Sequence, residues 1–415
     1  LKEPVGISET ATSIGFIYHR WGNFGKALEY FERALAVSRR AGDREGEAVA
    51  LNNMALTQTD LGMYDKAEES VMQSISISRQ TNDEKGEAIA RNILGAIYYS
   101  RGDYLAAIQA YRQAQEYYRS KNEAYQLGSI HNNLGDAYTK AGWYPQALES
   151  LEMALRQLKQ SRVEIEGSTF YSNIGVVFEN MGALAKAEEY YKLALEHIRK
   201  FNNPAVEREV LINLGNLARH QNDLSKAIKY YQDCVNLCQR HKMPDGLPKD
   251  MMANVYLDSY EIAKAEPLVA ESGYSRTMAR LCLVRSDYGK AADYYEKTVK
   301  LAEQKLDYND LFLGFTGLGT VSEKLGQYDR AADFYRKAID STEEIRSSLS
   351  TGLDRDNFFS VRIGGFRRID PYKGLARVLI KLNRQEEALK WSEYSKARLF
   401  AESFSRRSGT SVSSV

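Results

Sequence analysis

Residues 94–114 read LGAIYYSRGDYLAAIQAYRQA, and this stretch determines the fold of the chain. It begins with a Leu-Gly pair, passes through a Gly-Asp turn and ends with Ala107, Tyr111 and Ala114. Positions three, four and seven residues apart lie on one side of an α-helix. The stretch therefore predicts a helix, a short turn and a second, antiparallel helix. The glycine of the first helix allows the second helix to approach closely.

The same pattern recurs along the chain with a nearly constant period. Its alanine is found ten times, at Ala27, Ala67, Ala107, Ala147, Ala187, Ala227, Ala265, Ala291, Ala331 and Ala388. Seven of the nine intervals are 38 to 40 residues long, and the other two are 26 and 57 residues. A constant period with small residues at fixed positions is the signature of a repeat array. We therefore predict an all-α solenoid of antiparallel helix pairs, with about nine to ten repeats.

The period also predicts where the array is irregular. Prolines and glycine interrupt it at Pro244, Gly246, Pro248 and Pro267, which predicts a loop over residues 241–248 and a bend that acts as a hinge. The predicted parts are six regular repeats over 1–240, an irregular junction over 241–275, C-terminal repeats over 276–403 and a flexible tail over 404–415.

One interval near the C-terminus is too long. About 17 extra residues separate Ala331 from Ala388, near residues 347–353 and 358–362. They predict either a loop or an extended helix pair at this place.

Bulk composition excludes several classes of function. Lys and Arg total 56 and Asp and Glu total 55 among 415 residues, so no net charge attracts nucleic acid or a membrane. The sequence has no run of 18 apolar residues and no signal-peptide core at its start. Three cysteines argue against a disulfide framework. We therefore expect a cytoplasmic protein that binds neither nucleic acid nor membrane.

The phased Leu-Gly, alanine and aromatic positions resemble the tetratricopeptide repeat. The usual repeat has 34 residues, whereas this one has 40, as in the subgroup found in kinesin light chains, cell-polarity adaptors and bacterial signalling regulators. The resemblance implies a right-handed superhelix that binds proteins. The first helices of the repeats would line its concave groove.

The C-terminal segment carries a second, narrower resemblance. Its motifs are Phe358-Phe359-x-x-Arg362, Tyr372, Asn383-Arg384-x-Glu-Glu-Ala-Leu and Lys396-Ala397-Arg398. They are similar to the segment that joins tetratricopeptide repeats to a caspase-like CHAT peptidase domain in bacterial proteins. That resemblance implies a regulatory sensor, which in some relatives is partnered with an RNA-guided effector. None of the five histidines is followed by Gly, so the His-Gly motif of the peptidase is missing from this chain.

Asparagines recur at two neighbouring positions of the first helices. One position holds Asn52, Asn92 and Asn132, and the next holds Asn53, Asn133, Asn173 and Asn213. Stacking turns a shared position into a row of amides, each with donors and an acceptor for a peptide backbone. Two interpretations stay open: the amides bind a partner, or they bond between repeats and hold the stack. Asn216, Tyr99 and Arg219 complete the predicted groove, whose variable positions would select one partner.

Candidate catalytic and metal-binding residues are few. Cys234, Cys238 and His241 have the spacing of a metal site, but Cys234 stands at the small-residue position of the repeat and is better interpreted as a buried apolar side chain, as is Cys282. His19 and His131 either face the groove or pack between helices. The sequence shows no nucleophile with a base, and we predict no enzyme activity, no cofactor and no metal.

The sequence thus favours a protein-interaction scaffold whose concave groove binds a peptide or helix of a partner. The alternative is the sensor module of a CHAT peptidase whose peptidase domain lies outside this chain.

Overall fold

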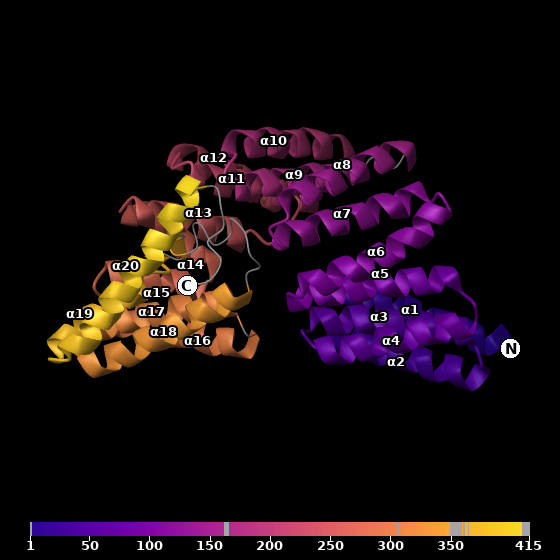
Figure 1. The fold of residues 1–415 in the computed structure, drawn as a ribbon, viewed down its shortest axis with the longest axis horizontal. Coiled ribbons are helices and arrows are strands. Elements are labelled where there is room, and N and C mark those ends of the chain that lie inside the picture. Colours follow the sequence, from indigo (N-terminus) through magenta and orange to yellow (C-terminus); the bar gives the residue numbers. More distant parts are fainter. Residues whose placement is uncertain are drawn as a thin grey trace. The chain divides into compact units, whose positions relative to one another are not determined.

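The computed structural model describes residues 2–161, 166–305, 307–348, 359, 362–363 and 365–408. The chain forms two compact units, residues 1–173 and residues 174–415. Figure 1 shows the helices of each unit following one another in chain order. Within this described part, no helix combines the length and the apolar character needed to cross a membrane.

The first unit consists of consecutive helix pairs. Its helices are α1 (Lys2–Arg20), α2 (Phe24–Ala41), α3 (Arg44–Asp60), α4 (Tyr64–Gln80), α5 (Glu84–Arg101), α6 (Tyr104–Ser120), α7 (Ala124–Lys140) and α8 (Tyr144–Ser161). Helix α9 (Gly167–Asn180) begins in the first unit and ends in the second.

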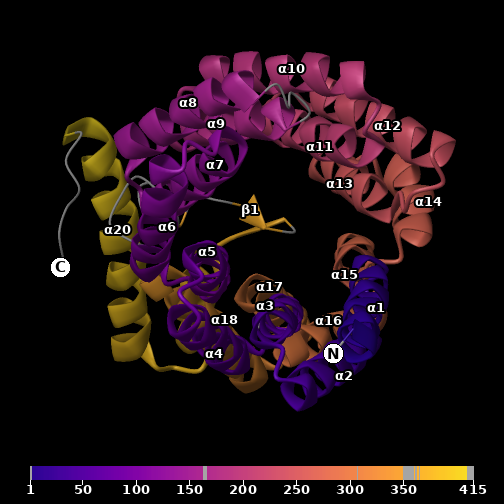
Figure 2. The ribbon, with the colours of Figure 1, turned by 90° about the vertical axis from the view of Figure 1, so that its right-hand side faces the viewer.

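The second unit continues the pairs and adds two short strands. Its helices are α10 (Leu184–Phe201), α11 (Pro204–His220), α12 (Leu224–Arg240), α13 (Gly246–Asp258), α14 (Ile262–Ser272), α15 (Ser275–Val284), α16 (Tyr288–Lys305), α17 (Tyr308–Lys324), α18 (Tyr328–Ser348), α19 (Asp370–Lys381) and α20 (Gln385–Ser408). Its strands are β1 (Arg362–Ile363) and β2 (Phe366–Arg367). Figure 2 shows α11 and α13 in one row and α10, α12 and α14 in another. The described residues thus form ten helix pairs, which confirms the predicted all-α solenoid.

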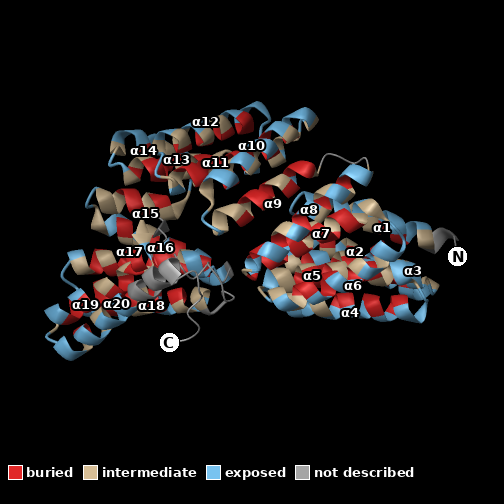
Figure 3. Ribbon diagram, turned by 45° about the horizontal axis from the view of Figure 1, so that its top comes forward, coloured by how far each residue is buried: buried red, intermediate tan, exposed pale blue. Residues whose placement is uncertain are grey.

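In several pairs, a glycine of the first helix packs closely against a ring of the second. A Cβ atom added to Gly95 would lie 2.5 Å from Cδ1 of Tyr111, so only glycine leaves room for the ring. Tyr111 is buried, and Ala107 on the same side of α6 is completely buried. The same contact recurs in the pairs Gly175–Tyr191, Gly215–Tyr231 and Gly319–Tyr335. In Figure 3 the buried residues follow the facing sides of the helices, as the period predicts.

The turn inside a repeat also follows from its residues. Gly102 ends α5 in the left-handed region, with φ of 90°. The side chain of Asp103 then accepts a hydrogen bond from the backbone N–H of Ala106, which caps the start of α6.

Two short helices, α13 and α14, lie within residues 241–275, and a third, α15, begins at Ser275. Helices α13, α14 and α15 have 13, 11 and 10 residues, against 17 to 18 in most other helices. Pro267 lies inside α14, as expected from the sequence. The predicted loop over 241–248 is too long, since α13 already begins at Gly246. Pro248 fits into its first turn because the first four N–H groups of a helix have no partner within the helix. The two compact units meet at residue 173, and a hinge at 241–275 stays a prediction.

The long interval before Ala388 is filled in two ways. Helix α18 extends to Ser348, and β1 pairs with β2 in an antiparallel hairpin in which Ile363 faces Phe366. Among the described elements, this two-residue ladder is the exception to the helices. Most of the predicted extra segment, residues 349–358, lies outside the described residues. Helix α20 runs to Ser408, so the predicted tail boundary at 403/404 falls within a helix, and residues 409–415 are outside the described part.

Candidate partner-binding face

The exposed side of the first helices in unit 1 carries apolar side chains beside an amide. Val49, Asn53 and Leu56 are four and three residues apart, so they share one side of α3. Val49 is 43 % exposed and Leu56 is 37 % exposed. One period away, Ile89 of α5 is 38 % exposed and Phe16 of α1 is 51 % exposed. Helix α3 contacts both α1 and α5, and Phe16 and Ile89 hold the positions of Leu56 and Val49 on these neighbouring helices; the five residues are here called the unit 1 face.

Some of the predicted asparagines bond from one repeat to the next. Asn133 Nδ2 donates to Asn92 Oδ1 at 3.1 Å, and Asn173 Nδ2 donates to Asn132 Oδ1 at 2.9 Å. Each bond joins a first helix to the following first helix, from α5 to α7 and from α7 to α9. These four amides therefore make the inter-repeat bonds that one of the two interpretations predicts. The bonds also occupy two of the acceptors that a peptide backbone would use.

The row of amides is interrupted at its N-terminal end. Ile93 stands at the position from which an asparagine would donate to Asn52. Among the described residues, Oδ1 of Asn52 is buried without a hydrogen-bond partner. The neighbouring Asn53 turns to its own helix, where Nδ2 donates to the carbonyl oxygen of Val49 at 3.0 Å. The amide bonds between repeats thus begin at α5 and do not extend to α3.

Other predicted groove residues form hydrogen bonds within the protein. Burial, together with the hydrogen-bonded carboxylate of Asp136, raises the pKa of Tyr99. In unit 2, Asn216 Oδ1 accepts a hydrogen bond from the Tyr231 hydroxyl at 2.8 Å.

The ten predicted residues are divided between the two units. Unit 1 contains Asn52, Asn53, Asn92, Asn132, Asn133, Asn173 and Tyr99, and unit 2 contains Asn213, Asn216 and Arg219. The structure therefore does not bring the ten together in one described site, and their role in partner binding stays a prediction.

Both candidate histidines have neighbours within the fold. His131 is buried, and its Nε2 atom lies 3.3 Å from Nε2 of Gln115, within hydrogen-bond distance. Burial lowers the pKa of His131 to about 4, with help from Arg119 and Arg156. His19 Nε2 lies 2.8 Å from Asp60 Oδ2 at the ends of α1 and α3. The packed interpretation is therefore confirmed for His131.

Two of the three cysteines behave as buried apolar side chains, whereas Cys282, which was also expected to be buried, is only half-buried. Cys234 and Cys238 are buried, and burial raises the pKa of Cys234 to about 12. A thiol with such a pKa stays protonated and binds metals poorly. Among the residues that the structure describes, no group of three or more His, Cys, Asp or Glu side chains is placed to hold a metal ion.

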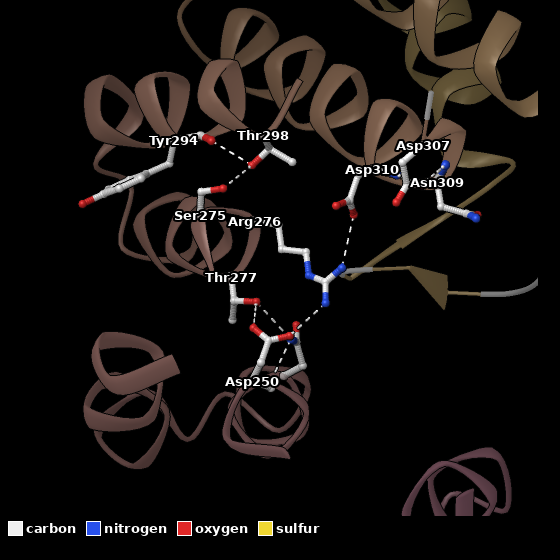
Figure 4. Close-up of polar contacts among 10 residues, drawn as sticks. Asp250, Ser275, Arg276, Thr277, Tyr294, Thr298, Asp307, Asn309 and Asp310 are labelled. Atoms are coloured by element: carbon white, nitrogen blue, oxygen red, sulfur yellow. Dashed lines mark hydrogen bonds and ion pairs between the residues drawn. The ribbon is translucent and has the colours of Figure 1, made fainter. Parts of the chain in front are cut away.

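Sequence reasoning missed a polar network between α13, α15 and α17 in unit 2 (Figure 4). Asp250 of α13 is buried, accepts a hydrogen bond from the Thr277 hydroxyl and lies 3.3 Å from Arg276 Nη2. Arg276 also reaches Asp310 of α17, with 3.3 Å between Nη1 and Oδ1. Burial raises the pKa of Asp250 above its ordinary value, although the contacts with Thr277 and Arg276 act in the opposite direction.

A second part of the network is centred on Arg280, which is 8 % exposed. Its Nη1 donates to Asn254 Oδ1 at 2.8 Å, and its Nη2 donates to Asp258 Oδ1 at 2.6 Å. The predicted groove residue Arg219 donates to the other oxygen of Asp258, also at 2.6 Å. Burial disfavours the charged form of Asp258, but Arg280 and Arg219 outweigh it and hold the pKa of Asp258 below its ordinary value.

One signal in the sequence identifies this network. Asp250 stands at a position of the repeat that is apolar and buried in the five preceding repeats, at Ala50, Ala90, Ile130, Phe170 and Val210. A carboxylate at a core position requires charged or hydrogen-bonding partners nearby. The break in the pattern at Asp250 therefore predicts an arginine or hydroxyl in the next repeat.

The chain is similar in fold to several solved structures. A Rap protein complexed with competence and sporulation factor is 12% identical over 83% of this chain and 99% of that chain, with a TM-score of 0.48. Yeast Tom70 is 14% identical over 94% of this chain and 91% of that chain, with a TM-score of 0.47. A signal-transduction ATPase with a tetratricopeptide repeat sensor, from Pyrococcus horikoshii, is 15% identical over 91% of this chain and 52% of that chain, with a TM-score of 0.47.

No curated protein sequence matches the chain. Family models, in contrast, match most of it. One tetratricopeptide repeat model matches residues 6–80, 86–160 and 168–240, and a second one matches residues 315–344. The first model alone accounts for more than half of the chain, in agreement with the helix pairs of the structure. The chain therefore belongs to the tetratricopeptide repeat family.

Proposed function

We propose that this protein is an interaction scaffold whose unit 1 face binds an extended peptide segment of a partner protein. The observation that carries the proposal is the exposure of Phe16, Val49, Leu56 and Ile89 on one side of three stacked first helices. Contiguous exposed apolar side chains rimmed by polar groups are typical of protein-binding surfaces.

The chemistry of the unit 1 face suits a peptide. Each repeat contributes one or two apolar side chains at equivalent positions, which match side chains spaced along an extended segment. Asn53 is half-buried among them; its Nδ2 donates to the carbonyl oxygen of Val49, and its side-chain oxygen offers an acceptor for a peptide N–H. The balanced charge of the chain, 56 basic against 55 acidic residues, does not favour a nucleic acid as the ligand.

Binding to the unit 1 face can be tested without knowing the partner. A random peptide library is selected on the full chain, and the affinity of the selected peptides is measured for the wild type and for Val49→Asp combined with Ile89→Asp. The loss of apolar contacts is expected to weaken binding at least tenfold, or by about 1.4 kcal/mol.

A matched control uses exposed apolar residues of the second helices. Met72 of α4 and Leu105 of α6 are 48 % and 56 % exposed, so Met72→Asp combined with Leu105→Asp introduces the same charges elsewhere. This control is expected to bind the selected peptides as the wild type does. Equal losses in both variants, or a loss in neither, contradict the proposal.

A second candidate function is a sensor module attached to a CHAT peptidase. The specific observation is that residues of the C-terminal motif pack in one core: Phe359 and Tyr372 contact each other edge to face at 5.8 Å between ring centres, and Ala388 belongs to the same cluster. The coding sequence beyond residue 415 tests this function. A His-Gly motif followed by a catalytic cysteine supports it, and a stop codon or an unrelated domain contradicts it.

A further inference from the structure

The hairpin β1–β2 lies against the first-helix side of unit 2. Its turn contains Gly365, whose φ of 94° favours glycine. A Cβ atom added to Gly365 would lie 2.6 Å from Nε and 2.9 Å from Cζ of Arg280. Any larger residue would therefore collide with the guanidinium group. The hairpin backbone rests directly on the side chain of Arg280.

The surface under the hairpin is held in place by unit 2 itself. Asn254 and Asp258 of α13 accept hydrogen bonds from the two Nη atoms of Arg280. Because both ends of the guanidinium group are bonded, its planar face stays oriented for contact. Arg280 is thus held in place by residues outside the hairpin.

A second anchor is aromatic. The ring of Phe366 lies 6.5 Å from the ring of Tyr295, between centroids, and packs against the core formed by α15, α16 and α17. Tyr295 is completely buried, and Gly317 of α17 approaches its ring so closely that an added Cβ atom would lie 2.4 Å from Cζ. The hairpin therefore extends this core by one aromatic side chain.

A third anchor is cationic. Arg368 Nη2 donates to Asn309 Oδ1 at 2.9 Å, at the start of α17. Arg368 is half-buried, and this burial lowers its pKa to about 10. Asp310, the next residue of α17, adds negative charge on the same turn. The three anchors, Gly365, Phe366 and Arg368, thus lie within four consecutive residues.

We propose that this surface of α15 and α17 is a second recognition site, for protein segments that carry a glycine, then an aromatic residue and, two positions after it, an arginine. In this chain the site is occupied by residues 365–368, Gly-Phe-Arg-Arg. A partner with a segment of the same chemistry binds by displacing the hairpin. The proposal does not depend on the unit 1 face, since it rests on residues of unit 2 alone.

Displacement of the hairpin by a partner segment is physically reasonable because the hairpin is small. Its ladder joins two residue pairs, Arg362 with Arg367 and Ile363 with Phe366. An isolated two-stranded hairpin is at best marginally stable in water. The hairpin therefore owes its order to the three anchors, and a competing segment that supplies the same anchors can replace it.

The test uses the full chain with Gly365→Val. The new side chain and the positive φ together exclude the docked turn. The probe is a fluorescein-labelled peptide with the sequence of residues 362–369, and fluorescence anisotropy measures its binding. Gly365→Val is expected to bind the probe at least tenfold more tightly than the wild type, whose site is occupied. A probe in which alanine replaces the phenylalanine is expected to lose this gain.

A matched control is Gly289→Val in α16, because no heavy atom lies within 4 Å of a Cβ atom added to Gly289. This variant is expected to bind the probe as weakly as the wild type does. Equal affinities of Gly365→Val and the wild type overturn the proposal.

A second variant covers the case in which Gly365→Val does not fold. Phe366→Ala removes one anchor, and amide hydrogen exchange is expected to become faster in residues 275–284 and 308–312 than in the wild type and the Gly289→Val control. Unchanged exchange in these residues overturns the proposal as well.

Discussion

The first-helix sides of the two units differ in charge and in what lies on them. In unit 1, Val49 and Ile89 are exposed, and neutral amides bond from repeat to repeat. In unit 2, Asp250 and Arg280 are buried, Asp250 at the core position that Ala50 and Ala90 hold in unit 1, and the chain's own hairpin rests on Arg280 through Gly365. In unit 1, where the repeats are regular, the first helices keep an exposed apolar surface that a partner could contact. In unit 2, where one repeat is shortened, buried charged side chains are paired with residues of the same unit.

The physical origin of the difference is the separation of the partners along the chain. The amide bonds of unit 1 join residues 41 positions apart, which is one period and one residue. In unit 2 the bonds of Asp250 with Thr277 and of Arg280 with Asn254 join residues 27 and 26 positions apart. The shortened repeat brings unlike residues together, so bonds between two amides are replaced by hydrogen bonds in which one partner is charged.

The largest expected effect is the loss of Arg280. Arg280→Leu leaves Asn254 and one oxygen of Asp258 without their donor, and breaking such a buried pair typically costs about 3–5 kcal/mol. Hydrogen exchange in α13 to α15 measures the loss of local stability.

The matched variant in unit 1 is Arg91→Leu. Arg91 pairs with Glu87 at 2.7 Å, but both side chains are partly exposed, so the expected cost is below about 1 kcal/mol. Equal costs for Arg280 and Arg91 would contradict the contrast between the units.

The second expected effect is an acid sensitivity of unit 1. The pKa of His131 is about 4 in the folded protein, against 6.5 ordinarily, so the unfolded chain binds a proton that the folded unit does not. Stability is therefore lost as the pH falls from 6.5 to 4, by up to roughly 3 kcal/mol.

Denaturation at several pH values measures this slope, and His131→Gln is expected to flatten it. In unit 2 the raised pKa of Asp250 acts with the opposite sign, because the folded unit holds that proton more tightly. A slope that persists in His131→Gln would assign the acid sensitivity to another group.

The third expected effect concerns the packing that both units share. Gly95→Ala in unit 1 and Gly319→Ala in unit 2 would each push a Cβ atom into a tyrosine ring, at 2.5 Å and 2.7 Å. Overpacking of this kind costs about 1–3 kcal/mol. Thermal unfolding compares these variants with Gly25→Ala, whose added Cβ atom meets nothing within 4 Å and which should gain stability from the better helix propensity of alanine. Destabilisation by Gly25→Ala would show that the ring contact is not the cause.

The smallest expected effect separates the two interpretations of the amides. Asn132→Ala removes a bond between repeats and should cost about 1 kcal/mol. Asn52→Ala removes a buried acceptor that has no partner among the described residues, so it should cost less. Denaturant unfolding measures both. If Asn92→Ala and Asn132→Ala instead weaken peptide binding without a change in stability, the amides serve the partner.

Much of the fold could be predicted from the sequence because the contacts within a repeat are local. The glycine of a first helix and the ring that packs on it, such as Gly95 and Tyr111, are 16 positions apart and recur at one spacing. The repeat period also predicted the buried position of Cys234, which stands where Ala34, Ala114 and Ala194 stand in other repeats. The predicted loop over 241–248 was too long because a proline in the first turn of α13 does not prevent a helix from starting.

The sequence by itself determined that this chain is a stack of helix pairs, which residues face the core, and where the period fails. Only the tertiary structure decided which amides bond, how Asp250 and Arg280 are neutralised, and where the hairpin lies. The reason is distance along the chain: Arg368 meets Asn309 across 59 residues. A periodic pattern specifies contacts within one repeat and between neighbours, but it carries no signal for a segment that returns to earlier helices.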